Sequence, residues 1–301
     1  MMINFQGLKP GDKLRVIAPS GALREWERFE AGVKIWRSHG YNLEFTSGFD
    51  QVNGYLAGSD ENRRQQLIEA LTDETCRGIL CARGGFGSTR LLEGWKWKNI
   101  AQISPVPKFL IGFSDITGLL WAFSNSPQII GIHGPVVTTL ASEPDWSIQR
   151  LFDGIETGFF EELQGEGWGG GSVLGRLFPA NLTVATHLLG TAYQPDLTDS
   201  IIALEDVNEE PYRLDRMLTH WRMVGAFKGV RGIALGRFSR CEAEGNSNSF
   251  TLEEVLRDRL GDLGIPIVSN LPFGHEGSNA ILPVGRVVHL DGKQGILSFS
   301  E

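Results

Sequence analysis

The first half of the chain alternates short apolar runs with segments whose apolar residues recur at helical spacing. Runs of this kind predict strands flanked by amphipathic helices, because buried strands are short and apolar while surface helices repeat every 3.6 residues. The expected strands cover residues 13–18, 42–45, 78–82, 108–112 and 128–133, and the expected helices cover residues 25–39, 60–72 and 116–123.

This alternation predicts an α/β fold. Strands and helices that follow one another at this spacing form a mostly parallel sheet covered by helices on both faces. We therefore expect an N-terminal, doubly wound, flavodoxin-like domain over residues 1–160. Ligands of such sheets bind beyond the carboxyl ends of the strands.

The second half has a different pattern. It predicts a smaller C-terminal domain over residues 173–301, mixed and rich in strands, with the glycine-rich segment 161–172 as a linker. A solvent-exposed linker rarely keeps a tryptophan, so Trp168 suggests that the segment folds over a site. The expected strands are 201–205, 232–235, 265–269, 284–290 and 295–299, and the expected helices are 181–189 and 211–224.

Composition narrows the function classes. The chain has 301 residues, a net charge of −8 and a pI near 5.4, which disfavours nucleic acid as a partner. It contains no apolar stretch of the roughly 18 residues that a membrane span needs. Its amino terminus lacks the basic and apolar regions of a signal peptide, so we expect a cytoplasmic protein.

The three cysteines do not suggest a disulfide framework. Cys81 lies in a buried-strand pattern, and Cys76 and Cys241 are not at metal-ligand spacing. The histidines are scattered. We therefore expect no metal site and no cofactor.

Ser114 is the first candidate for chemistry. It follows the apolar strand that ends at Gly112 and precedes a helical pattern, where free backbone N–H groups favour negative charge. Two interpretations compete, a serine that caps the helix and a nucleophile whose intermediate is an oxyanion. The hydrolase motif G-x-S-x-G is incomplete because Ile116 occupies the second glycine position. Taken alone, the motif favours capping, and a serine can fill both roles.

Glu205 and Asp206 end the apolar strand of the second half. An acid at a strand end can point into a cleft while its backbone stays anchored. The alternative is a solvated acidic turn ahead of the helix at Pro211.

His275 lies in a glycine-rich loop after the strand 265–269. A loop histidine suits a general base, whose pKa must lie near the working pH. The alternative is an ordinary exposed histidine. Among the other histidines, only His133, at the end of a strand, is a rival.

Several motifs, in this order along nearly the whole chain, resemble the LD-carboxypeptidase family, serine peptidases that include muramoyltetrapeptide carboxypeptidase and microcin C self-immunity hydrolases. The combination is more specific than any single motif. The motifs are APSG at 18–21, AGSDENR at 57–63, CARGGFGS at 81–88, IGFSDIT at 111–117, LEDVNEEPYRLDRML at 204–218 and LPFGH at 271–275.

The resemblance implies a catalytic triad. By motif position, Ser114 is the nucleophile, His275 the base and Glu205 the orienting acid, the three residues reached above from the pattern alone. It also implies an oxyanion hole formed by the backbone N–H of Asp115 and by a second N–H from the turn at residues 84–85, that is, Gly84 or Gly85. A glycine turn lets the backbone approach a ligand closely.

The resemblance also implies a substrate. The expected reaction hydrolyses the amide to a terminal D-amino acid, with murein tetrapeptides that lose D-alanine in cell-wall recycling as the leading case. The expected partners are this peptide or a related small amide, and a second copy of the chain in a homodimer. Candidate substrate-binding residues are Arg83, Phe86, His133, Trp168 and Asn181.

Some residues depart from the family pattern. Pro179 and Ala180 precede Asn181 where many members have two glycines, and Phe86 stands where a tyrosine is frequent. Arg83 could bind the substrate carboxylate or form an ion pair within the protein.

Three other functions stay open. The first is cleavage of an aminoacyl-nucleotide amide, with Trp168 stacked on the base. The second is a cysteine-dependent, amidotransferase-like enzyme, which needs Cys76 or Cys81 at an exposed turn. The third is a non-catalytic binder of cell-wall peptides.

Overall fold

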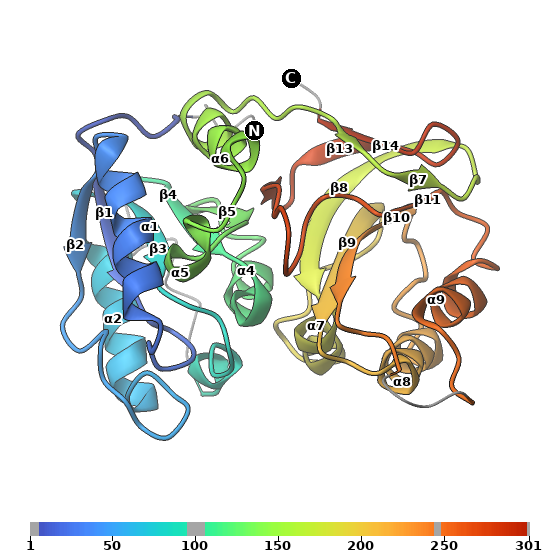
Figure 1. Cartoon of the computed structure of the whole chain (residues 1–301), viewed down its shortest axis with the longest axis horizontal. Coiled ribbons are helices and arrows are strands. Elements are labelled where there is room, and N and C mark those ends of the chain that lie inside the picture. The colour runs from blue at the N-terminus through green and yellow to red at the C-terminus, as the bar shows by residue number, and fades with distance from the viewer. Residues whose placement is uncertain (1–5, 95–105, 244–247, 300–301) are drawn as a thin grey trace. The chain divides into compact units, whose positions relative to one another are not determined.

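The computed structural model describes residues 6–94, 106–243 and 248–299. The chain forms two compact units, each with its own sheet (Figure 1). The first unit comprises Met1–Phe159 together with Ile281–Val284. The second comprises Phe160–Ala280 and Gly285–Glu301.

The first unit contains a six-stranded sheet in the order β12-β5-β4-β3-β1-β2. All neighbouring strands are parallel except β12, which pairs antiparallel with β5. The order 2-1-3-4-5 of its parallel strands is that of flavodoxin-like folds, which confirms the predicted doubly wound sheet. The strands are β1 (Lys13–Ile17), β2 (Asn42–Phe45), β3 (Cys76–Cys81), β4 (Lys108–Gly112), β5 (Ile129–His133) and β12 (Leu282–Pro283).

Helices of the first unit bury one face each. Helix α1 buries Phe29, Val33 and Trp36 and packs against α5, whereas α2 and α4 pack against the short turn η1. Right-handed crossovers from β1 to β2 and from β2 back to β3 place α1 and α2 on opposite faces of the sheet. The helical segments are α1 (Trp26–Ser38), α2 (Asp60–Thr72), η1 (Thr89–Leu92), η3 (Ser114–Ile116), α4 (Thr117–Ala122), α5 (Val137–Leu140) and α6 (Asp145–Thr157).

The second unit is built on an eight-stranded mixed sheet in the order β6-β14-β13-β8-β9-β10-β11-β7. Strands β8 to β11 are parallel, and the flanking strands are antiparallel to their neighbours. The prediction of a mixed, strand-rich second domain is confirmed. Its elements are β6 (Leu163–Gln164), β7 (Glu166–Gly167), β8 (Ser172–Asn181), α7 (Leu182–Leu188), β9 (Ser200–Val207), α8 (Pro211–Met223), β10 (Gly232–Ser239), α9 (Leu252–Leu260), β11 (Ile267–Ser269), β13 (Val287–Asp291) and β14 (Ile296–Phe299).

Two segments differ from the sequence expectations. The strand expected at 284–290 begins only at Val287, because Gly285 adopts a φ of 77° between the short strand β12 and β13. The segment 161–172, expected as a linker, contributes the short strands β6 and β7, which pair with β14 and β11 of the second unit. Within the described ranges, no helix has the length and apolar character needed to cross a membrane.

Candidate active site

Ser114 lies where β4 ends and the backbone turns sharply into η3. Its φ of 61° places a non-glycine residue in the left-handed region, which L residues rarely adopt. The cap positions of η3 and α4 are Phe113 and Ile116, and neither has a side-chain capping bond. The expectation that Ser114 caps the helix is therefore wrong, because the chain turns at the serine itself. A strained serine between a strand and a helix has the geometry of a nucleophile elbow.

Two glycines allow this turn. A Cβ at Gly112 would lie 2.9 Å from Cγ1 of Ile116, so the isoleucine occupies the space over the strand end. A Cβ at Gly84 would lie 3.1 Å from Cβ and 3.2 Å from Oγ of Ser114. The loop after β3 thus lies directly against the serine. A side chain at position 84 would push Ser114 away by a few tenths of an ångström.

Asp115 connects three loops at the carboxyl edge of the first sheet. Its buried carboxylate accepts hydrogen bonds from Ser20 Oγ at 2.6 Å and from the backbone N–H of Ser88 at 2.7 Å. The Ser88 hydroxyl donates in turn to the carbonyl oxygen of Asp115. Burial raises the pKa of the Asp115 carboxyl. The side chain therefore has a structural role that the sequence analysis, which considered only its N–H, did not include.

Arg63 is a second connecting residue that the sequence analysis missed. Its side chain is fully buried and donates from Nη1 to the carbonyl oxygens of Pro19 at 2.6 Å and Gly87 at 2.8 Å. It also forms an ion pair with Asp60. The available signal was its place on the apolar face of α2, where a charged residue is unusual.

Arg83 is paired within the first unit. Its Nε and Nη2 donate to the two carboxylate oxygens of Glu25 at 3.0 and 3.1 Å. This bidentate contact is an ion pair within the protein, one of the two roles expected for Arg83. Phe86 is exposed, with its ring centre 5.9 Å from that of Tyr55. His133 is buried at the end of β5, with its ring edge-on to Phe113.

The second unit brings Glu205 and His275 together. His275 Nδ1 donates to Oε2 of Glu205 at 2.6 Å, and the carboxylate is fully buried near the end of β9. Gly274, with a φ of 116°, lets the loop pass so close that a Cβ there would lie 3.0 Å from Cβ of Glu205. Burial opposes protonation of His275, but the Glu205 charge outweighs it and raises the pKa of the imidazole.

Asn181 and Asp206 lie directly behind this pair. Asn181 Nδ2 donates to Asp206 Oδ1 at 2.9 Å and to Glu205 Oε1 at 3.3 Å. Burial and the neighbouring Glu205 charge raise the pKa of Asp206 to about 6. Asn181 therefore contacts the two acids, a role that the sequence analysis did not foresee.

Trp168 lies apart from the pair of Glu205 and His275. It directly follows β7, which is three strands away from β9, or about 14 Å at ordinary strand spacing. Its indole donates to Ser269 Oγ at 2.9 Å, and the Arg257 guanidinium lies 4.5 Å from its ring centre. The structure thus holds the tryptophan on its own unit through β11 and α9.

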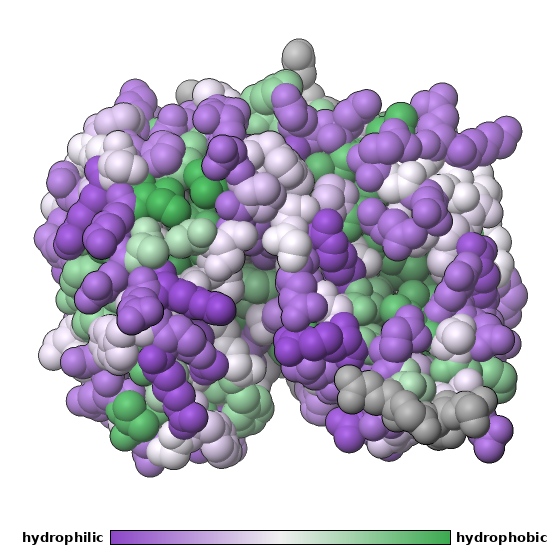
Figure 2. Space-filling model, viewed as in Figure 1, coloured by the Kyte–Doolittle hydropathy of each residue, from purple (hydrophilic) through white to green (hydrophobic). Residues whose placement is uncertain are grey.

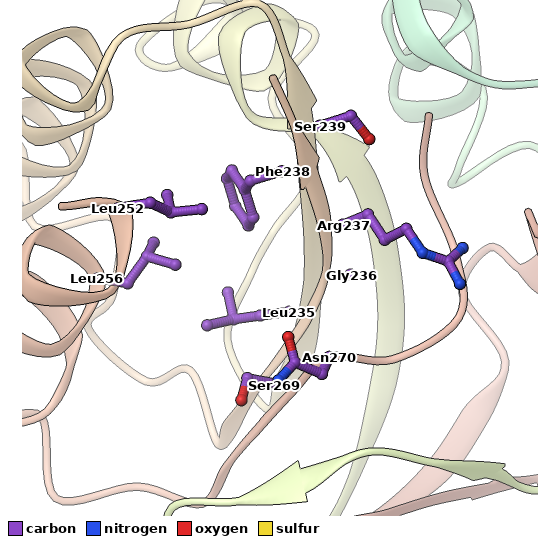
Figure 3. Close-up of a pocket in the computed structure, with 9 residues that line it drawn as sticks. All are labelled: Leu235, Gly236, Arg237, Phe238, Ser239, Leu252, Leu256, Ser269 and Asn270. Atoms are coloured by element: carbon purple, nitrogen blue, oxygen red, sulfur yellow. The ribbon is translucent and has the colours of Figure 1, made fainter. Parts of the chain in front are cut away.

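A groove opens between α9 and the ends of β10 and β11. Figure 3 shows its apolar side chains facing one another, and Figure 2 shows the apolar surface in this part of the second unit. Its volume is about 290 Å³, and it is lined by Leu235, Gly236, Arg237, Phe238, Ser239, Leu252, Leu256, Ser269 and Asn270. Arg237 points out of the groove, where its guanidinium donates to Ser278 in the loop that carries His275.

All three cysteines are buried as free thiols. Burial raises the pKa of Cys81 and of Cys76, and raises that of Cys241 to about 12. A reactive cysteine needs an exposed, electropositive setting. The cysteine-dependent alternative therefore lacks its nucleophile at Cys76 and Cys81.

Comparison with known families agrees with this geometry. The model of the LD-carboxypeptidase N-terminal domain matches residues 14–134, and the model of the LD-carboxypeptidase C-terminal domain matches residues 174–290. The chain belongs to the LD-carboxypeptidase family. It is accordingly a peptidase of the carboxypeptidase class.

Similar proteins extend over nearly the full chain. A Synechocystis protein with a provisional carboxypeptidase name is 56% identical, covering 97% of this chain and 95% of its own. The murein tetrapeptide carboxypeptidase of Pseudomonas aeruginosa is 32% identical, covering 94% of both chains.

Solved structures share the two-unit architecture. The muramoyltetrapeptide carboxypeptidase of Oxalobacter formigenes has a TM-score of 0.81 at 28% identity, covering 95% of this chain and 97% of its own. The microcin C7 self immunity protein MccF has a TM-score of 0.84 at 20% identity, covering 98% of both chains. The likeness to MccF concerns the fold alone.

Proposed function

We propose that this LD-carboxypeptidase family member is a serine hydrolase that removes the terminal D-alanine from murein tetrapeptides in cell-wall recycling. The observation that carries the proposal is the 2.6 Å bond between His275 and the buried Glu205. An imidazole held by a carboxylate is the base that a serine nucleophile requires. Relatives named for murein peptides support the choice of substrate.

In the proposed reaction, the first unit supplies the nucleophile and the second supplies the base. Ser114 Oγ attacks the amide carbonyl while Nε2 of His275 takes its proton, and Glu205 stabilises the imidazolium. His275 then protonates the leaving amine of D-alanine. Water, activated by the same imidazole, hydrolyses the acyl-enzyme and regenerates the serine.

The oxyanion of the tetrahedral intermediate needs two N–H donors. We propose that they are the N–H of Asp115, which follows the nucleophile, and that of Gly84 or Gly85. The close approach of Gly84 to Ser114 supports this assignment. The anchoring of Asp115 by Ser20 and Ser88 supports it further, because an oxyanion hole works only when its donors are held in advance.

The alternative of aminoacyl-nucleotide cleavage gains no support from Trp168. The Arg257 guanidinium lies over its ring, and its N–H is bonded to Ser269. Stacking of a nucleobase on that face would first require the arginine to move.

The test is release of D-alanine from L-Ala-γ-D-Glu-meso-diaminopimelate-D-Ala, measured with D-amino acid oxidase. We expect release by the wild type and a loss of at least about a thousandfold in Ser114→Ala. Ser124→Ala, beyond the far end of the adjacent helix, is the matched control and should keep full activity. The same peptide ending in L-alanine should not be cleaved, as measured by chromatography of the tripeptide product, since the oxidase does not detect L-alanine.

Other outcomes would reject specific parts of the proposal. Absence of release by the wild type would exclude the murein substrate, and an aminoacyl-nucleotide amide would then be tried. Equal release by wild type and Ser114→Ala would exclude Ser114 as the nucleophile.

A further inference from the structure

Two consecutive carboxylates are buried at the end of β9. The exposed fractions of Glu205 and Asp206 are 0% and 2%. Successive residues of a regular strand point to opposite faces, yet one side chain, that of Asn181, reaches both acids. Burying a charge is costly unless hydrogen bonds compensate it. The hydrogen-bond donors around Asp206 therefore determine how its burial is compensated.

Neutral donors surround the Asp206 carboxylate. Its Oδ2 accepts from the N–H of Thr183 at 2.9 Å and from Thr183 Oγ1 at 2.8 Å. Its Oδ1 accepts from Asn181 Nδ2 at 2.9 Å and from the N–H of Val207 at 2.8 Å. None of these four donors is a cation, so they hold the carboxylate in place without cancelling its charge.

Asn181 connects this carboxylate to Glu205. Strand register places Asn181 of β8 directly beside Glu205 of β9. Its Nδ2 lies within bonding distance of both acids, and its Oδ1 accepts from the N–H of Val184 in the first turn of α7. Both polar atoms of the amide are therefore committed to the protein, which fixes the orientation of the amide.

We propose that Asn181 and Asp206 are positioning residues, which hold the Glu205 carboxylate on His275 and do not contact the substrate. This inference rests on the proposed function in treating Glu205 and His275 as the working pair. It assigns Asn181 a different role from the substrate contact suggested by its motif. It also explains why a second buried acid is present beside the first.

The charges near His275 determine whether loss of the Asp206 charge raises or lowers the pKa of the imidazole. Glu205 and Asp206 favour the imidazolium, whereas Arg240 opposes it, and Arg240 is itself paired with Glu276 at 3.0 Å. The Cys241 thiol, whose high pKa keeps it neutral, interacts electrostatically with both acids and with Glu209. Removing the Asp206 charge should therefore lower the pKa of His275.

The experiment titrates His275 in the intact chain by NMR of the histidine ring protons, with its signal assigned from His275→Gln. We expect Asp206→Asn to lower the pKa of His275 by roughly half a unit to one unit. Glu209→Gln is the matched control, because it removes a nearby acid that is paired with Arg213. It should leave the His275 titration within about a tenth of a unit, since Arg213 offsets the charge of Glu209. An unchanged pKa in a folded Asp206→Asn protein would overturn the proposal.

Steady-state kinetics distinguish a positioning role of Asn181 from direct contact with the substrate. Asn181→Ala should lower kcat about tenfold with KM changed less than twofold, because only the Glu205 orientation is lost. A raised KM with unchanged kcat would show substrate contact and reject the inference. Thr183→Val, which removes one hydroxyl, is the variant least disturbing to folding and should lower kcat a few-fold with an unaltered KM.

The titration needs no substrate. If the wild type fails to release D-alanine, the proposed function fails, but the His275 pKa still tests the role of Asp206. If D-alanine is released and the pKa does not respond to Asp206→Asn, the function stands and this inference fails.

Discussion

The backbone at Ser114 is strained, and the protein does not need this strain in order to fold. A residue in the left-handed region costs of order 1 kcal/mol unless it is glycine. Its φ of 61° predicts that Ser114→Gly stabilises the protein by about 1 kcal/mol while abolishing activity. Ser114→Ala, which keeps a Cβ, is the control and should show no such gain. The measurement is urea unfolding of the three proteins, and equal stability of both variants would argue against strain at this turn.

The pair of Glu205 and His275 predicts a specific pH profile. A base must be neutral to accept a proton, so activity is lost as pH falls through the pKa of His275. Because Glu205 raises that pKa, the acid limb of kcat/KM should lie above the ordinary histidine value of about 6.5.

Glu205→Gln tests this assignment. It should move the acid limb to lower pH and reduce kcat by roughly a thousandfold or more, since the amide no longer stabilises the imidazolium. Glu209→Gln should leave the acid limb of kcat/KM at its wild-type pH. A limb that does not respond to Glu205→Gln would mean that another group controls the profile.

Residue types and strand ends were enough to find Ser114, Glu205 and His275 as candidates, since each follows a readable apolar run. The contacts of Arg63, Asp206 and Asn181 could not be derived in this way. These side chains interact with backbone and acids that are distant in sequence, so their roles appear only when β8, β9 and the loops are placed side by side.

At the scale of elements, the hydrophobic pattern located most strands and failed where glycine or proline interrupts a strand. Strand β8 escaped notice because Gly175 and Pro179 lie within it, residues that strands usually exclude. Strand β11 begins after the expected position, because Pro266 cannot donate to the ladder. The boundary of a strand thus depends on hydrogen bonding that hydropathy does not encode.

One side chain of helix α2, that of Arg63, contacts two loops at the carboxyl edge of the first sheet. Arg63 donates to carbonyl oxygens in the loops after β1 and β3. Arg63→Met should leave both carbonyls and Asp60 without this partner and destabilise the protein by about 3 kcal/mol. Arg90→Met removes an exposed partner of the same acid and should cost less than about 1 kcal/mol. Thermal unfolding compares them, and similar losses would argue against a structural role for Arg63.

At the scale of the whole molecule, the chain leaves the second unit for four residues and then returns to it. Ile281–Val284 belongs to the first unit, where β12 pairs with the edge strand β5, while residues on both sides belong to the second unit. Gly131 and Gly134 leave room for this segment, since a Cβ at either would lie within about 3 Å of Val284 or Ile281. The two sheets are thus joined by an interleaved segment and not by a single linker.

This interleaving predicts that the two units unfold together. Unfolding of the second unit would pull β12 from the first sheet and expose the edge of β5, so neither unit keeps its full stability alone. Fluorine NMR of fluorotryptophan-labelled protein can follow Trp121 in the first unit and Trp221 in the second through one urea titration. We expect coincident midpoints in the wild type. Leu282→Asp places a charge at a fully buried position of β12 and should separate the midpoints, because a loosened β12 no longer couples the sheets. Separate midpoints already in the wild type would show that β12 does not couple them.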